Sequence, residues 1–183
     1  MVLAAYERIA AEGFEGLRTR DVAADVGVNV ATLHYYFPTK EALIRAVVGY
    51  AMSRFVATIP TEGSGSAVLR GHLQGLARLI KEDRQLWAVL GELTLRAPRD
   101  PDLGQILGKT DQTWQAKLAE MLRSAAAGAG LTPGLNADDA AAVIVATIKG
   151  LALPTLSGSD PGRVDRVFGQ LLNWVGLQDQ ITQ

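Results

Sequence analysis

Residues 19–43 read TRDVAADVGVNVATLHYYFPTKEAL, and this stretch decides the fold. Apolar residues recur at helical spacing over residues 20–26, and Gly27 supplies the positive φ that commonly ends such a helix. Asn29 is a strong helix cap and begins a second short helix over residues 30–35. Two short helices joined by a turn that contains glycine predict a helix-turn-helix.

The second of these helices is suited to contact with a polyanion. Residues 26–39 contain no acidic side chain and offer hydroxyl, amide, imidazole and phenol groups. Leu33 and Phe37 are its expected core anchors. Thr39 is placed to cap a following helix over residues 40–58, and Lys40 lies beside the positive end of that helix, where a phosphate also binds.

Composition restricts the functions that remain. The chain has 183 residues, of which 48% are hydrophobic and 20% charged, as in ordinary globular proteins. The absence of cysteine excludes disulfides, thiolate metal sites and cysteine nucleophiles, and two histidines support neither a metal centre nor a Ser-His-Asp site. We therefore expect no enzymatic activity, no metal and no cofactor.

Targeting and membrane segments are not indicated. Glu7 and Arg8 interrupt the apolar start of the chain, which argues against a secretory signal. Residues 140–156 are the longest nearly uncharged apolar stretch, but Lys149 and Pro154 break it, and it is too short to cross a bilayer. We expect a cytoplasmic protein without a membrane partner.

Apolar residues recur mostly at three- and four-residue steps along the whole chain, and this spacing predicts an all-α fold of about nine helices. Residues 60–66, PTEGSGS, show the strongest change in composition. We place a domain boundary there. The amino-terminal domain, residues 1–59, holds the helix-turn-helix, and residues 60–183 form a second helical domain.

The first helices of the second domain are suited to enclose an apolar cavity. Gly71 and Gly75 leave a notch on one side of the helix over residues 66–81, and tryptophan and methionine side chains adapt to ligands of irregular shape. The same spacing is typical of plain helical core. The predicted ligand-binding residues are His72, Leu76, Trp87, Leu90, Trp114, Leu118 and Met121, with Gln74, Glu92 and Gln115 as further polar contacts.

The last two helices are suited to a two-fold four-helix bundle. The helix over residues 137–153 is apolar nearly all round, so it must be covered on two sides. Its residues Ala142, Ala146 and Gly150 make a flat stripe where a second helix can come close. The predicted dimer interface is Ala142, Ala146, Gly150, Val164, Phe168, Leu171, Leu172 and Val175. An intramolecular core is the alternative.

The amino-terminal motifs resemble the DNA-binding domain of the TetR family of bacterial transcriptional regulators. The resemblance covers nearly all of residues 1–50 and rests on GF at 13–14, TRDVA at 19–23, GVN at 27–29 and ATLHYYFPTKEAL at 31–43. Carried over position by position, it implies that Lys40 binds a phosphate and that the DNA-binding residues are Thr19, Arg20, Asn29, Val30, Ala31, Thr32, His34, Tyr35, Tyr36 and Lys40.

The resemblance also implies an activity. In this family the carboxy-terminal helices usually bind a small effector, and the last two helices usually form the dimer interface. The chain is thus expected to be a homodimeric repressor, released from an inverted-repeat operator in double-stranded DNA by a small-molecule effector. Ala31 and His34 replace the glycine and tyrosine that are frequent in the family, so base preferences do not carry over. Relatives often have several more residues before the first helix, which favours Met1 as a truncated or internal start.

Charge keeps other hypotheses open. Residues 1–60 contain six basic and six acidic side chains, and the chain has a formal net charge of −1, so any attraction to DNA must be local. If Arg18, Arg20 and Lys40 face DNA, a dimer neutralises about six phosphates, with a log–log salt slope of about −5. The alternative is a helical small-molecule-binding or protein-interaction module that does not read DNA. An activator, or a nucleoid-type binder without an effector, is a third hypothesis.

Overall fold

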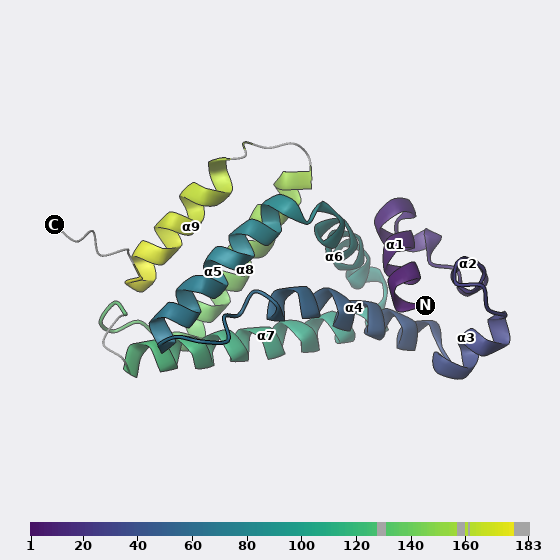
Figure 1. Cartoon of the computed structure of the whole chain (residues 1–183), viewed down its shortest axis with the longest axis horizontal. Helices are drawn as coiled ribbons and strands as arrows, with labels where there is room; N and C mark the ends of the chain where they lie inside the picture. Colours follow the sequence, from purple (N-terminus) through teal and green to yellow (C-terminus); the bar gives the residue numbers. More distant parts are fainter. Residues whose placement is uncertain (128–130, 157–159, 161, 178–183) are drawn as a thin grey trace. The chain divides into compact units, whose positions relative to one another are not determined.

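The structure, a computed structural model, describes residues 1–127, 131–156, 160 and 162–177 (Figure 1). Within these residues the chain forms nine α-helices and two 3-10 turns, which confirms the all-α prediction. None of the described helices combines the length and apolarity that crossing a membrane requires. The elements are α1 (Val2–Glu12), η1 (Phe14–Gly16), α2 (Thr19–Asp25), α3 (Val30–Tyr36), α4 (Lys40–Val56), α5 (Gly65–Glu82), α6 (Arg84–Arg96), η2 (Ala97–Arg99), α7 (Pro101–Ala127), α8 (Ala137–Leu156) and α9 (Gly162–Val175).

The helices pack into two compact units. The first comprises Met1–Arg54 and Arg84–Thr110, and the second comprises Phe55–Asp83 and Asp111–Gln183. Helix α6 therefore belongs to the same unit as the helix-turn-helix, although it follows residues 60–66 in the sequence. Because these units follow spatial contacts rather than chain order, the predicted domain limits stay a prediction.

Helix α1 is the centre of the first unit. It packs against α6 on one side and against α2 on another, and its residues Ala5, Tyr6 and Ile9 are buried. Gly13 ends α1 with a φ of 72°, a conformation that residues with a side chain rarely adopt. Helices α2 and α3 pack on each other, with Leu33 fully buried between them and the rest of the unit.

Helix α5 is the centre of the second unit and packs against α8 and α9. The predicted notch on α5 is filled by the chain itself. A Cβ at Gly71 would lie 2.6 Å from Pro60 Cγ, and a Cβ at Gly75 would lie 2.6 Å from Thr58 Cβ. The two glycines thus let the segment after α4 approach α5 closely, and they do not open space for a ligand.

Candidate nucleic-acid interface and effector site

Helix α3, the second helix of the helix-turn-helix, begins at the predicted cap. The Asn29 side-chain oxygen accepts a hydrogen bond from the backbone N–H of Thr32 at 2.7 Å and another from the Thr32 hydroxyl at 2.9 Å. Gly27, with a φ of 68°, makes the turn that separates α2 from α3. The Asn29 side-chain oxygen is therefore occupied in capping, which fixes the start of α3.

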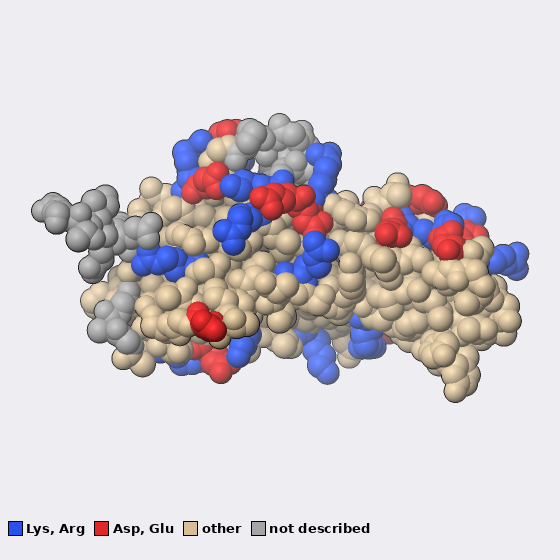
Figure 2. Space-filling view, viewed as in Figure 1, with Lys and Arg blue, Asp and Glu red and all other residues tan. Residues whose placement is uncertain are grey.

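Helix α3 presents polar and aromatic side chains to solvent. Tyr35 is 82% exposed and Tyr36 61% exposed, and their rings meet edge to face with centroids 5.2 Å apart. Ala31 and His34 are also exposed, whereas of the two predicted anchors Leu33 is fully buried and Phe37 is half-buried. Figure 2 shows that the visible surface over α3 carries no acidic side chains. This face suits contact with phosphates and base edges.

A hollow of about 700 Å³ lies between the start of α2, α3 and the start of α4. Thr39 caps α4 by accepting the backbone N–H of Ala42 at 3.1 Å, as predicted. Five predicted DNA-binding residues line the hollow together with Arg18: Thr19, Arg20, Val30, His34 and Lys40. The structure thus brings three cationic side chains and the first turn of α4 to one concave surface.

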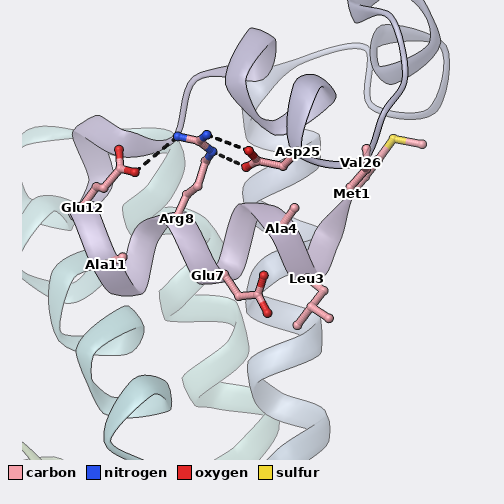
Figure 3. Close-up of a pocket in the computed structure, with 9 residues that line it drawn as sticks. All are labelled: Met1, Leu3, Ala4, Glu7, Arg8, Ala11, Glu12, Asp25 and Val26. Carbon is pink, nitrogen blue, oxygen red and sulfur yellow. Dashed lines mark hydrogen bonds and ion pairs between the residues drawn. The ribbon is translucent and has the colours of Figure 1, made fainter.

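Arg8 pairs with carboxylates of α1 and α2. Figure 3 shows its guanidinium pointing at the Asp25 carboxylate. Both residues line a hollow of about 540 Å³. Arg8 Nη2 donates to Asp25 at 2.8 Å, Nε also donates to Asp25, and Glu12 lies 3.4 Å from Nη1. Hydrogen bonds from Arg8 lower the pKa of the Asp25 carboxyl below its usual value. These contacts join α1 to the end of α2, so Arg8 is not among the cations that line the hollow between α2, α3 and α4.

Lys40 is half-buried in the first unit. Its ammonium lies 4.3 Å from the centroid of the Phe14 ring, and burial lowers the pKa of Lys40 below its usual value. Sequence reasoning missed Phe14 as a partner of Lys40. A phenylalanine in a short turn gives no periodic signal, and only packing shows what lies against its ring.

The predicted ligand-binding residues are divided between the two units. Trp87 is buried and Leu90 half-buried on α6 of the first unit. The other five are buried on α5 and α7 of the second unit: His72, Leu76, Trp114, Leu118 and Met121. Among the further polar candidates, Gln74 is exposed and Gln115 half-buried. Glu92 accepts the backbone N–H of Phe14 at 3.0 Å inside the first unit.

His72 and Trp114 are linked through Phe55 and Thr58. The Thr58 hydroxyl donates to the Phe55 carbonyl at 2.7 Å, so it accepts from Nδ1–H of His72, which lies 2.7 Å away. Burial lowers the pKa of His72 from 6.5 to about 4, so the ring is neutral at pH 7 with Nε2 as its acceptor nitrogen. The centroids of the Phe55 and Trp114 rings lie 4.8 Å apart. The buried Trp114 indole N–H has no hydrogen-bond partner among the described residues.

The predicted dimer residues divide into exposed and buried groups. Ala142, Ala146 and Gly150 are exposed at steps of four along α8. On α9, Leu172 is half-buried, whereas four predicted residues are buried within a single chain: Val164, Phe168, Leu171 and Val175. Helix α9 packs against α5, and Lys81 of α5 pairs with Asp165 of α9 at 2.7 Å. Those four residues are thus buried by contacts within one chain, as the alternative of an intramolecular core expects, and the dimer interface stays a prediction.

Comparison with known proteins identifies both parts of the chain. Residues 2–47 match the family described as bacterial regulatory proteins, tetR family. Residues 66–175 match the family described as BetI-type transcriptional repressor, C-terminal. A search among curated proteins gives no match.

Solved structures of about the same length share the fold. A Rhodococcus sp. protein assigned to the TetR-family transcriptional regulators is 24% identical, with a TM-score of 0.86 over 96% of this chain and 95% of that one. A TetR transcription regulator from Haloarcula marismortui is 20% identical, with a TM-score of 0.80 over 95% and 93%. A Saccharomonospora viridis protein assigned as a transcriptional regulator, solved in complex with choline, is 23% identical, with a TM-score of 0.73 over 94% and 92%.

The family matches favour a regulator over a module that does not read DNA. They also agree with the expectation that the chain is not an enzyme, because the family consists of transcription regulators. The chain belongs to the TetR family of transcriptional regulators, with an amino-terminal helix-turn-helix domain that binds DNA and a BetI-type carboxy-terminal domain that binds an effector.

Proposed function

We propose that this chain is a homodimeric repressor that binds an inverted-repeat operator and leaves it when a small effector binds. The observation that carries the proposal is the outward face of α3, where Tyr35 and Tyr36 are exposed and His34 lines the hollow beside Lys40. Aromatic side chains exposed on a short helix contribute little to a core and lower solubility. A binding partner that covers them explains their presence.

DNA binding divides between the hollow and the tip of α3. Arg18, Arg20 and Lys40 neutralise phosphates beside the first turn of α4, where the helix dipole also favours an anion. His34, Tyr35 and Tyr36 then reach bases or the adjoining backbone in the major groove. With three cations a subunit, a dimer neutralises about six phosphates, which gives a log–log salt slope of about −5.

Dimerisation would use the exposed stripe on α8. Ala142, Ala146 and Gly150 lack bulky side chains, so a second copy of α8 can approach closely there, with Leu172 of α9 at its side. Two-fold symmetry would then place two recognition helices in successive major grooves, about 34 Å apart. This geometry requires an inverted-repeat operator.

The effector would bind at the cluster of Phe55, Thr58, His72 and Trp114. The Trp114 indole N–H is a buried donor that finds no partner in the described part of the chain, and a buried donor of this kind costs about 1–3 kcal/mol unless a ligand or water satisfies it. Neutral His72 can accept a hydrogen bond at Nε2. A hundredfold loss of operator affinity needs only about 2.7 kcal/mol of differential effector binding.

Selection of bound duplexes from a random DNA pool tests the operator. We expect the full chain to enrich a palindrome whose half-sites are separated by about one helical turn. The selected palindrome is then placed upstream of a reporter gene in a heterologous host, where co-expression of the chain should lower reporter output. Enrichment without symmetry would contradict the dimeric reading, and a rise in output would contradict repression.

Light scattering tests the dimer face. Ala146→Arg adds a charged side chain to the exposed α8 stripe and should leave a folded monomer, whereas wild type should be a dimer at micromolar concentration. Ala116→Arg, at an exposed alanine of α7, is the matched control and should remain dimeric. A dimer in both variants would show that the interface lies elsewhere.

A further inference from the structure

One aromatic ring of the first unit holds two cations. Phe14 of η1 is 3% exposed, and its ring centroid lies 4.3 Å from the Lys40 ammonium nitrogen and 4.4 Å from the Arg96 guanidinium carbon. Both distances are within the range of cation–π attraction. Two positive groups on one ring repel each other, so an anion nearby determines how they are arranged.

That anion is Glu15, the next residue of η1. Arg96 Nη1 donates to Glu15 Oε1 at 2.6 Å. Burial lowers the pKa of Lys40, and among the charges around it Glu15 opposes that shift most, whereas Arg96 adds to it. Glu15 also follows directly after Phe14, whose ring lies against both cations, so it is a neighbour of both, and in this structure its hydrogen bond goes to Arg96.

The other carboxylates near Lys40 are Asp100 and Glu41. Asp100 accepts the backbone N–H of Leu103 at 3.1 Å and so caps α7. Glu41 has its pKa lowered by hydrogen bonds from its own backbone and from Thr39. Asp100 and Glu41 thus each have partners close to them in the sequence. Glu15 differs, because its hydrogen-bond partner Arg96 lies on another helix, α6.

Helix α6 is held against η1 at a second point. Glu92 lies one turn before Arg96, on the same face of α6. Its Oε1 accepts the backbone N–H of Phe14 at 3.0 Å. A Cβ at Gly13 would come within 3.3 Å of this oxygen, so the glycine allows the close approach. Glu92 and Arg96 together place α6 so that the guanidinium reaches both the Phe14 ring and Glu15.

We propose that Arg96 is a positioning residue for phosphate binding: by holding Glu15, it leaves the Lys40 ammonium available to a DNA phosphate. When the Arg96–Glu15 pair opens, Glu15 pairs with Lys40 and withdraws it from DNA. The inference rests on the proposed role of Lys40 at the operator. Because the Glu15 side chain is 80% exposed, its pair with Arg96 contributes little to stability, and its effect is on which cation the carboxylate holds.

Operator affinity of the full chain, measured by fluorescence anisotropy on the selected duplex, tests this exchange. Arg96→Gln should weaken binding about tenfold and reduce the magnitude of the salt slope by about one for each subunit, because Lys40 no longer displaces counterions. The double variant Glu15→Gln/Arg96→Gln should recover most of the affinity. Arg99→Gln removes the same charge from an exposed position three residues away, and should change binding less than twofold.

Two outcomes would overturn the inference. One is equal binding by Arg96→Gln and Arg99→Gln, and the other is a double variant as weak as Arg96→Gln. Arg96→Lys, which can still pair with Glu15, should bind nearly as wild type. Recovery of binding in the double variant, which carries the same Arg96→Gln change, shows that the loss in Arg96→Gln does not come from unfolding.

A readout without DNA separates this inference from the proposed function. The lysines of each variant are dimethylated with ¹³C, and the Lys40 signal is assigned with Lys40→Arg and followed by NMR against pH. The pKa of Lys40 should be higher in Arg96→Gln than in the double variant, because only the former keeps a free Glu15 carboxylate. Equal pKa values in the two variants would overturn the exchange. A wild-type chain that enriches no duplex would instead count against the proposed function.

Discussion

Helices α3 and α7 both carry aromatic side chains, and they use them in opposite ways. Tyr35 and Tyr36 of α3 form an edge-to-face pair that faces solvent. Trp114 of α7 forms a similar pair with Phe55, but it is only 8% exposed. The same kind of contact therefore forms part of a surface in one unit and part of a core in the other.

The two histidines show the same contrast. His34 is exposed at the edge of the hollow, whereas His72 is 2% exposed and hydrogen-bonded to Thr58. Helix α3 has seven residues, of which Leu33 alone is fully buried, Val30 and Thr32 are half-buried, and the other four are exposed. The comparison teaches that the number of covering neighbours, rather than residue type, decides which role an aromatic side chain has.

The largest change in the free energy of unfolding is expected at Leu33. Leu33→Ala leaves a cavity at a position that is 0% exposed, so the free energy of unfolding should fall by about 2–5 kcal/mol. The matched change Tyr35→Ala, on the outer face of the same helix, should stay within about 0.5 kcal/mol of wild type. Urea unfolding of the full chain measures both. Similar losses for the two variants would show that Tyr35 is a core residue.

Acidification tests the buried histidine. The pKa of His72 is about 4 in the folded chain against 6.5 in the unfolded one, so between these values the unfolded chain binds more protons. Stability should therefore fall as pH drops from 6.5 to 4, by about 3 kcal/mol from this residue. His72→Gln should flatten the dependence of unfolding free energy on pH, and the exposed control His34→Gln should not. A flatter pH dependence in His34→Gln than in His72→Gln would contradict a buried, neutral His72.

Operator affinity tests the role of the exposed aromatic side chains of α3. Tyr36→Ala should weaken specific binding about thirtyfold, because each subunit loses a contact worth about 1 kcal/mol and a dimer therefore loses about 2 kcal/mol. The thermal midpoint should remain near that of wild type, since the side chain is 61% exposed. Anisotropy and thermal unfolding are measured on the same preparation. Parallel loss of binding and folding would make Tyr36 part of the core.

The smallest effect is expected from Trp114→Phe. This change removes a buried N–H that has no partner within residues 1–127, 131–156, 160 and 162–177, and it keeps an aromatic ring against Phe55, so the unfolding free energy should change by less than about 1 kcal/mol. Trp114→Ala should cost about 3–5 kcal/mol. Any compound that releases wild type from the operator should be needed at higher concentration with Trp114→Phe. Unchanged release would remove the indole N–H from the effector site.

Local features of the recognition region could be predicted because neighbours in sequence decide them. The Asn29 and Thr39 caps and the break at Gly27 involve contacts within three residues or the φ of one residue. The buried state of Leu33 follows from its place in a short amphipathic pattern. The exposed state of α8 residues Ala142, Ala146 and Gly150 agrees with their small-residue stripe, while their role as an interface stays a prediction.

Contacts between distant residues could not be predicted in the same way. The notch at Gly71 and Gly75 suggested open space because periodicity cannot show that Thr58 and Pro60 fill it. The apolar face of α9 is compatible with a partner subunit or with α5, and burial within one chain decides for α5 at four positions. The grouping of α6 with the helix-turn-helix has no local signal at all.

The sequence by itself determined the helices, their caps, the break between α2 and α3, and the motif that places the chain in its family. These depend on hydrogen bonds and hydrophobic spacing within a turn or two, and such interactions are encoded by adjacent residues. Only the tertiary structure decided which aromatic rings face water, which helix Phe14 and Glu15 contact, and how His72 stays neutral. Each of those depends on desolvation by residues that are far away along the chain, and no local pattern records which residues those are.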